Sequence, residues 1–405
     1  MCPTVPAEAS DGRVRGRERA TAAPSQHTEY RICTRCVMDT SDENIAFDEL
    51  GRCAHCTSYE REAHGAGFIP PELQAERLAI AVAEIKRAGR GHRYDCLIGL
   101  SGGVDSSYVA LCVRNLGLRP LAVHLDNGWN SEEAVANIER VVRGLGIDLF
   151  TWVLDWDEFR ELQLAFLRAA TPDYEIPTDH AIVAANFKTA WRFRIPWLVM
   201  GHNVASELVL PSTWAQGHFD WRYIRSVHSR FAKRPLDTFP HLDTLGYLRF
   251  RRTVARRTLN ILNYIPYDRT KAIAELELST GWRDYGGKHY ESIYTRFIQG
   301  YVLPTKFGID KRRAHLAALV LAGLVTRDYA LAELAKPTYP CADLLHRDRL
   351  FVLKKLGLSD AEFAEIMATP RRTGWDFASM FNSPSYRGVR AVYRGARAVL
   401  GRGAV

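Results

Sequence analysis

The sequence predicts an α/β protein with a parallel sheet, preceded by a cysteine-rich module and followed by a mostly helical region. Strand-like apolar runs alternate with amphipathic segments between residues 94 and 201, two CxxC pairs lie before residue 57, and helical periodicity prevails from residue 267 onward. Alternating strands and helices build parallel sheets that are covered on both faces. The chain of 405 residues is long enough for two or three domains.

The individual elements follow from the hydrophobic periodicity. The expected strands cover residues 94–100, 120–125, 149–154 and 197–201. The expected helices cover residues 72–87, 104–116, 132–145, 156–170 and 179–193. Residues 211–257 are expected to be irregular, basic and aromatic, and the helical part that follows is expected to form a separate subdomain.

The composition restricts the cellular compartment and the classes of binding partner that we expect for this chain. No apolar run approaches the roughly 20 residues of a membrane helix, and the arginine-rich first 29 residues lack the apolar core of a secretory signal. Eight cysteines in a chain of this length do not suggest a disulfide scaffold, so we expect a cytoplasmic protein. The net charge of +8 suits acidic partners, namely nucleotides, phosphorylated sugars, RNA or an anionic membrane.

The cysteines before the predicted sheet have the spacing of a metal site. Cys33 and Cys36 form one CxxC pair, Cys53 and Cys56 form a second pair, and 16 residues separate the two pairs. Two such pairs supply four thiolates to one tetrahedral ion. We expect a structural zinc ribbon over residues 30–60, with iron as the less favoured metal.

A glycine-rich loop joins the first predicted strand to a helix. The loop reads Ser-Gly-Gly-Val-Asp-Ser-Ser over residues 101–107 and lacks the lysine of a Walker A loop. Its glycines and the helix N-terminus present backbone N–H groups to an anion. Asp105 would repel a phosphate unless a cation lay between them, which indicates Mg²⁺. The expected phosphate-binding residues are Ser101, Gly102, Gly103, Ser106 and Ser107.

Polar residues also follow the second and fourth predicted strands. Ligands of open parallel sheets bind beyond the carboxyl ends of the strands. Helix capping is nearly as good an explanation for the two asparagines in these stretches. The candidates for nucleotide or substrate contacts are Asp126, Asn127, Gly201, His202 and Asn203.

The stretch from residue 281 to residue 292 is dense in charged and aromatic side chains. Such density is costly to bury unless a ligand or mutual pairing compensates it. A solvated turn is the alternative, because two glycines and a tyrosine also suit a plain loop. The residues that we single out here and in the helix that follows are Trp282, Arg283, Asp284, Tyr285, Lys288, His289, Glu291 and Arg296.

These motifs carry a resemblance to known proteins. The SGGVDSS loop resembles that of the PP-loop ATP pyrophosphatases, whose core is an adenine nucleotide alpha hydrolase-like sheet. From about Cys33 to Met367 the chain resembles the N-acetyl sugar amidotransferases of bacterial surface-polysaccharide biosynthesis. The matching strings are "CTRCVMDTSDENIAFDELGRCAHC", "AVHLDNGWNSEEAVANIE", "EIPTDHAI", "GHNVASE" and "GWRDYGGKHYESIYTRFIQGYVLPTKFGIDKRRAHL".

The resemblance implies an activity and its partners. The enzyme would use ATP and Mg²⁺ to adenylate an acetamido oxygen of a nucleotide-linked sugar, such as an acidic diacetamido sugar, and substitute ammonia to give an acetamidino group. The product would enter lipopolysaccharide or O-antigen synthesis. A separate glutaminase and a barrel-shaped protein would deliver the ammonia. Nucleic acid is not an expected partner, and peripheral contact with the inner face of the membrane is expected.

The residue roles follow from the same resemblance, and the domain boundaries follow from the composition and the predicted elements. The expected catalytic residues are Asp105, Lys288, Arg283 and Glu207, and the expected substrate contacts are Trp282, Asp284, Tyr285, His289, Glu291 and Arg296. The expected division is a disordered tail (1–29), the zinc ribbon (30–60), a PP-loop ATP-binding domain (61–215), a basic and helical subdomain for substrate and partners (216–385) and a basic amphipathic tail (386–405).

Two other functions fit part of the pattern. The first is a tRNA-modifying adenylating enzyme, but sulfur transfer needs catalytic cysteines, and no cysteine lies between Cys112 and Cys341. The second is a zinc-ribbon RNA-binding protein with an inactive loop. The basic stretch from Arg222 to Arg257 suits RNA, an anionic membrane, a protein partner or a solvated helix face.

Overall fold

The computed structural model describes residues 29–63, 69–215, 217–253, 257–287, 290–380 and 383. A five-stranded sheet lies at its centre in the order β3–β2–β1–β4–β5, and every neighbouring pair is parallel. The strands are β1 (Cys96–Gly99), β2 (Pro120–Asp126), β3 (Asp148–Val153), β4 (Trp197–Met200) and β5 (Thr258–Asn260). The predicted parallel α/β core is confirmed.

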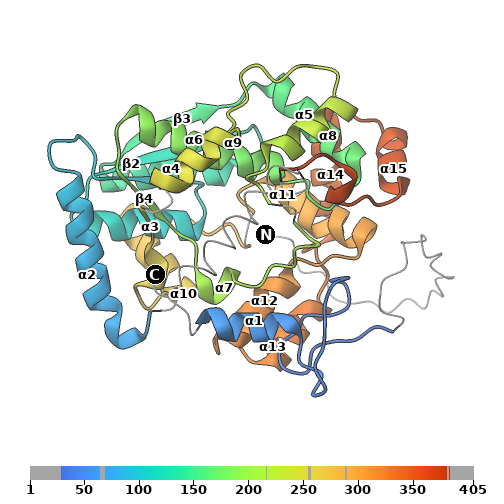
Figure 1. The fold of residues 1–405 in the computed structure, drawn as a ribbon, viewed down its shortest axis with the longest axis horizontal. Helices are drawn as coiled ribbons and strands as arrows, with labels where there is room; N and C mark the ends of the chain where they lie inside the picture. Colours follow the sequence, from blue (N-terminus) through green and yellow to red (C-terminus); the bar gives the residue numbers. More distant parts are fainter. Residues whose placement is uncertain are drawn as a thin grey trace.

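Helices cover both faces of this sheet, as the doubly covered fold requires (Figure 1). On one face, α3 (Val104–Asn115), α4 (Glu132–Leu145) and α10 (Arg269–Thr280) share a core with β1, and α2 (Pro71–Ala88) packs beside α3. On the other face, α6 (Ile176–Arg192) and α9 (Thr244–Thr253) pack against the opposite side chains of β1 and β2.

Part of this core was not predicted from the sequence. Strand β5 and helices α8 (Trp221–Phe231) and α9 lie within residues 211–257 and just beyond, where irregular structure was expected. Helix α6 begins at Ile176, three residues earlier than predicted, because Pro177 suits the first turn of a helix. The fifth strand therefore comes from chain beyond the expected boundary at residue 215.

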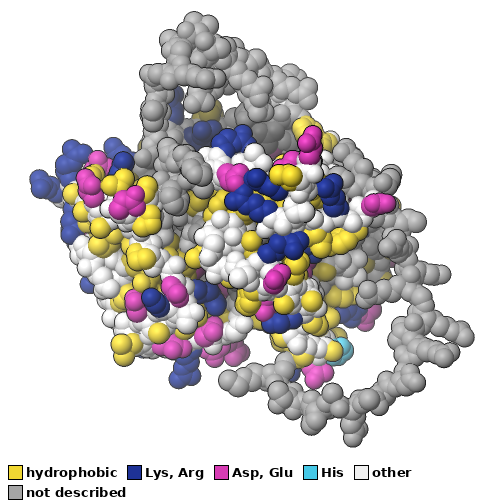
Figure 2. Space-filling view, turned by 90° about the horizontal axis from the view of Figure 1, so that it is seen from below, with side chains coloured by type: hydrophobic (Ala, Val, Ile, Leu, Met, Phe, Trp, Pro, Cys, Tyr) yellow, Lys and Arg dark blue, Asp and Glu magenta, His cyan; other side chains and the backbone are white. Residues whose placement is uncertain are grey.

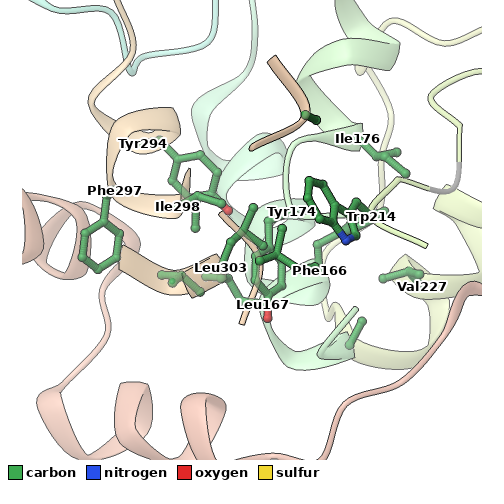
Figure 3. Close-up of a cluster of buried hydrophobic side chains, with 14 of the residues drawn as sticks. Phe166, Leu167, Tyr174, Ile176, Trp214, Val227, Tyr294, Phe297, Ile298 and Leu303 are labelled. Atoms are coloured by element: carbon green, nitrogen blue, oxygen red, sulfur yellow. The ribbon is translucent and has the colours of Figure 1, made fainter. Parts of the chain in front are cut away.

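The remaining helices form a second body around a large apolar cluster. Figure 3 shows its centre, where Phe166 and Tyr174 meet Trp214, Tyr294 and Leu303. The elements outside the sheet layers are α1 (Ala54–Ala63), α5 (Trp156–Ala169), α7 (Val204–Glu207), α11 (Ile293–Phe297), η3 (Ile298–Phe307), α12 (Arg312–Leu321), α13 (Arg327–Ala335), α14 (Ala342–Leu356), α15 (Asp360–Ala368) and the short turns η2 (Ile261–Asn263) and η4 (Gly374–Asp376).

Charge and hydropathy of the surface add two findings. On the face seen in Figure 2, Lys and Arg side chains alternate with Asp and Glu side chains, so this face carries no single continuous basic patch. Among the described residues, no helix combines the length and the apolar character needed to cross a bilayer. The two predicted tails lie outside the described residues, apart from Glu29.

Candidate functional site

The loop between β1 and α3 is shaped by a glycine that no other residue can replace without strain. Gly102 has φ +83°, and a Cβ at this position would lie 2.4 Å from the carbonyl oxygen of Ala134 in α4. The buried indole of Trp282 donates through Nε1 to the Gly102 carbonyl oxygen at 2.9 Å. The loop is thus clamped between α4 and the predicted site stretch 281–292.

The loop serines and the next glycine form a compact polar cradle. Ser101 and Ser106 hydroxyls lie 3.1 Å apart, and the Ser106 hydroxyl also donates to the Gly103 carbonyl oxygen. The buried hydroxyl of Ser107 has no hydrogen-bond partner among the residues that the structure describes. Backbone N–H groups at the start of α3, together with an orphaned hydroxyl, fit a phosphate anion.

Asp105 lies in the first turn of α3 and contacts a residue from the second half of the chain. Its carboxylate accepts a hydrogen bond from the hydroxyl of Tyr267. Burial raises the pKa of Tyr267, and the charge of Asp105 raises it further, so this phenol stays a proton donor. A carboxylate at a phosphate-binding loop is a suitable hard ligand for Mg²⁺.

The end of β2 lies beside the loop and is organised by side chains that the sequence did not reveal. Asp126 accepts from the backbone N–H of Gly128 at 2.9 Å, and Asn127 accepts from that of Trp129 at 3.1 Å. Lys355 of α14 donates to the Gly128 carbonyl oxygen and lies over the Trp129 ring, 5.0 Å from its centroid. Asn127 therefore shapes this turn and does not cap the helix that follows, because the N-cap of α4 is Ser131. The amide of Asn127 also reaches Thr178 at 3.5 Å.

A histidine of β2, close to its carboxyl end, is held in its neutral form. His124 Nδ1 lies 3.0 Å from the carbonyl oxygen of Leu100 and donates to it, and Nε2 accepts from the amide of Asn130 at 3.1 Å. Burial lowers the pKa of His124. The imidazole thus ties the end of β1 to the turn after β2.

The stretch after β4 approaches the same loop. A Cβ at Gly201 would lie 3.2 Å from the Val109 side chain of α3, so this stretch packs tightly against α3. His202 and Glu207 form an ion pair of 3.2 Å when the imidazole is protonated. The backbone N–H of Asn203 lies 3.5 Å from the Glu207 carboxylate, so the predicted residues of this stretch bind one another.

The stretch 281–292 reaches back over the loop, and α4 holds it there. Asn137, fully buried, accepts from the backbone N–H of Arg283 at 2.9 Å and donates to its carbonyl oxygen at 2.7 Å. The Tyr285 hydroxyl donates to Glu291 at 3.3 Å and would lie 3.1 Å from a Cβ at Gly103. Burial raises the pKa of Tyr285, and the charge of Glu291 adds to this.

Three of the predicted substrate contacts have internal roles in the structure. Trp282 donates a hydrogen bond to the Gly102 carbonyl oxygen of the loop, as described above. Asp284 accepts from the backbone N–H of Gly286 at 3.1 Å and shapes a turn. Arg296 pairs with Asp348 at 2.6 Å with both side chains largely buried. Lys288 and His289 lie outside the described residues.

A partly buried charged cluster was not predicted from the sequence. Glu175, just before α6, pairs with Lys311 at 3.1 Å and accepts from Gln299 at 2.7 Å. The hydroxyls of Tyr174 and Tyr294 are buried, and neither has a hydrogen-bond partner within the described ranges. Unpaired buried hydroxyls beside a carboxylate and an ammonium group suit a polar ligand. The string "EIPTDHAI" was the only sequence signal for this cluster.

The four cysteines of the predicted zinc ribbon meet at one point. Their sulfur atoms all lie within 4.8 Å of one another, and the Cys33–Cys56, Cys36–Cys53 and Cys53–Cys56 pairs are each 3.6 Å apart. A tetrahedral ion with Zn–S bonds of about 2.3 Å places its sulfurs roughly 3.8 Å apart. Backbone N–H groups of Arg35 and Cys53 point at the Cys33 sulfur and favour its thiolate form. The cluster therefore fits zinc.

The cysteine module is fastened to the C-terminal helices through its backbone. Arg327 of α13 donates to the carbonyl oxygens of Cys33 and Cys36 at 2.9 and 3.0 Å. Arg313 of α12 forms an ion pair of 3.1 Å with Asp39. On the same helix, His315 lies 3.0 Å from the carbonyl oxygen of Ser206, which follows β4. Helix α12 thus connects the metal centre to the edge of the sheet.

Two family models match parts of the chain. Residues 291–389 match the model described as "LPS biosynthesis protein WbpG-like, C-terminal domain", and residues 85–214 match the model described as "NAD synthase". An uncharacterized protein of Methanocaldococcus jannaschii is 24% identical over 131 residues, or 32% of this chain. The chain spans 45% of the length of that curated relative.

Two solved structures match the chain at low similarity. NMN synthetase from Francisella tularensis is 18% identical, with a TM-score of 0.27, over 34% of this chain and 57% of its own. The NH3-dependent NAD synthetase from Campylobacter jejuni is 13% identical, with a TM-score of 0.27, over 49% of this chain and 99% of its own. These scores are too low to support an inference about the site.

The two family matches adjoin each other in space. The NAD synthase match contains the glycine-rich loop and the first four strands. The WbpG-like match begins at Glu291, whose carbonyl oxygen accepts from the backbone N–H of Ser131 at 2.8 Å. The chain therefore combines an NAD synthase-like PP-loop α/β domain with a WbpG-like C-terminal domain of the lipopolysaccharide-biosynthesis kind, which supports the predicted resemblance to the surface-polysaccharide biosynthesis amidotransferases.

Proposed function

We propose that the protein is an ATP-dependent, AMP-forming C–N ligase of lipopolysaccharide synthesis. Its substrate is an N-acetyl group on a nucleotide-linked sugar, and its product is the corresponding acetamidino group. The observation that supports this best is the contact between the loop 101–107 and the stretch 281–292. One segment offers an anion cradle, and the other brings Tyr285 and Glu291 against it.

The chemistry follows from the weakness of an amide as an electrophile. The acetamido oxygen attacks the α-phosphorus of ATP, the bond to the β-phosphate breaks, and pyrophosphate leaves. Ammonia then adds to the activated carbon, the C–O bond breaks, and AMP departs with the former amide oxygen. The product is protonated at the amidine, so one acetamido group, one ATP and one ammonia yield one amidinium, one AMP and one pyrophosphate.

Each loop group has a role in this scheme. Backbone N–H groups from Gly102 to Ser106 and the Ser107 hydroxyl bind the outer phosphates, which leaves the α-phosphorus open to attack. Mg²⁺, when bound, supplies positive charge against the phosphates, and Asp105 holds it. Glu291 and Glu207 are the carboxylates that accept the proton released when ammonia adds.

The charged cluster around Glu175 is the proposed sugar subsite. Lys311 and Gln299 orient the carboxylate of Glu175, and the hydroxyls of Tyr174 and Tyr294 complete their hydrogen bonds with the sugar. Arg283 and Lys288 are proposed to neutralise phosphate charge. Ammonia is proposed to come from a separate glutaminase through a barrel-shaped partner.

The thiols of the ATP-binding half favour this activity over sulfur transfer. Cys96 is fully buried in β1, and burial raises the pKa of its thiol. Burial also raises the pKa of Cys112 to about 12, with the charge of Glu275 adding to it. Because the thiolate is the nucleophile, neither side chain suits a persulfide-carrying role.

The test is incubation of candidate nucleotide sugars with ATP, Mg²⁺ and ammonium, followed by mass spectrometry. We expect a product about one mass unit lighter, because NH replaces O, and AMP in equal amount. A Tyr285→Phe variant tests the contact between the two segments, and Tyr301→Phe is the matched control on η3. ADP as the nucleotide product, or mass loss without AMP, would rule the proposal out.

A further inference from the structure

Helix α9 contributes no buried residue to the fold. None of its ten residues from Thr244 to Thr253 is buried. Leu245 is 75% exposed and Leu248 is 50% exposed. Large apolar side chains on a helix normally point into a core, so their exposure here requires an explanation.

The orientation of α9 is fixed by its opposite face. Tyr247 lies 5.2 Å from the Phe219 ring, and Phe250 lies 5.8 Å from the rings of both Phe187 and Phe219. Positions three and four apart share one side of a helix. With Tyr247 and Phe250 facing inward, Leu245 and Leu248 share the outward side with Arg249 and Arg252.

The end of α6 extends this outward side. Trp191 is 57% exposed, and the guanidinium of Arg249 lies 4.2 Å from the centroid of its ring. Arg192 and Arg194 follow it and are also exposed. No acidic residue occurs in α9 or between residues 190 and 195. Asp243, just before α9, accepts from the backbone N–H of Gly246 and caps the helix.

We propose that this surface, formed by α9 and residues 191–194, docks on an anionic lipid bilayer. A helix with apolar and arginine side chains on one side lies in the interface, where the apolar groups enter and the arginines meet lipid phosphates. An indole such as that of Trp191 prefers the same depth. A nucleic acid would match the arginines but would leave Leu245 and Leu248 in water, so a membrane is the better partner.

The docking surface is separate from the proposed active site. Helix α6 starts beside the site, where Thr178 reaches Asn127, and ends at Arg192 next to the docking surface. Its 17 residues span about 26 Å. Variants on α9 should therefore leave nucleotide binding unchanged, and membrane binding can fail or succeed independently of the proposed function.

The experiment is flotation of the full-length protein with vesicles of equal parts phosphatidylcholine and phosphatidylglycerol. We expect binding that weakens as salt is raised and is absent with phosphatidylcholine alone. Each basic side chain at an anionic surface strengthens binding about fivefold. The double variant Arg249→Gln/Arg252→Gln should therefore bind roughly 30-fold more weakly. Leu245→Ser/Leu248→Ser should also lose binding, although the charge is unchanged.

A matched control carries the same change of charge elsewhere. Arg87→Gln/Arg90→Gln removes two exposed arginines at the end of α2 and should bind like the unaltered protein. Equal binding by the α9 variants and the unaltered protein would overturn the proposal, because the tails or another surface would then carry the attachment. Absence of flotation with anionic vesicles at low salt, or its loss after nuclease treatment, would overturn it as well.

Discussion

Replacing Gly102 with alanine tests whether the shape of the loop 101–107 governs nucleotide binding. A side chain in the left-handed backbone region costs roughly 1–2 kcal/mol. In addition, the new Cβ would lie 2.4 Å from the Ala134 carbonyl oxygen, so the loop or α4 must move. Overpacking of this kind costs about 1–3 kcal/mol. We expect a loss of about 2–5 kcal/mol in the free energy of unfolding.

The matched control is Gly146→Ala at the end of α4. Gly146 also has a positive φ, +60°, but no atom lies within 4 Å of the added Cβ. It should lose only roughly 1–2 kcal/mol. Urea denaturation gives the stability of both variants, and calorimetric titration with ATP and Mg²⁺ gives their affinity without any sugar.

The two variants should differ most in nucleotide binding. If the shifted loop loses one backbone hydrogen bond to the phosphates, the binding free energy falls by about 1.5–3 kcal/mol. Gly102→Ala should therefore bind ATP about 10- to 150-fold more weakly. Gly146→Ala should keep the original affinity. If both variants bound ATP equally well, the clash with Ala134 would not control the loop, and the reasoning from the cradle would fail.

Three further changes have expected outcomes. Asn137→Ala removes both hydrogen bonds to the Arg283 backbone, so urea denaturation should show a loss of about 1–3 kcal/mol in the free energy of unfolding. Burial lowers the pKa of His180 to about 4, and its Nε2 accepts from Leu242 N–H. In the unfolded chain the imidazole of His180 binds a proton below about pH 6.5, whereas in the folded chain it stays neutral down to about pH 4. The free energy of unfolding should therefore fall by about 3 kcal/mol between these pH values. His180→Gln should make the free energy of unfolding less dependent on pH in this range. A strong chelator should withdraw zinc from the cysteine site and remove roughly 10 kcal/mol, visible as earlier thermal unfolding, whereas Cys33→Ser should be insensitive to it.

The sequence predicted the elements whose signal is local. Strands β1, β2 and β4 are short apolar runs, and the glycine-rich loop carries its own conformational requirement at Gly102. The spacing of the two CxxC pairs is likewise sufficient to predict a metal site. In each case the residues that determine the feature lie within a few positions of one another, so periodicity and spacing are sufficient evidence.

The missed features depend on partners far along the chain. Strand β5 has only three residues, Thr258–Asn260, and becomes a strand because the edge of β4 is available. Asn137 is an ordinary polar position in α4 until Arg283, 146 residues later, binds it. Propensity carries no information about such pairs, because the energy that selects them comes from burial in the finished fold.

The long-range pairs also explain why the two halves of the chain form one site. The loop 101–107 belongs to the first half, but its Gly102 carbonyl is bound by Trp282 and its Asp105 by Tyr267. Without the second half, both groups would lose their partners and the sheet would lose β5. A buried acceptor that loses its donor costs about 1–3 kcal/mol. The geometry of the anion cradle is therefore a property of both halves, and the chain that brings Tyr285 and Glu291 to the cradle also holds the cradle in shape.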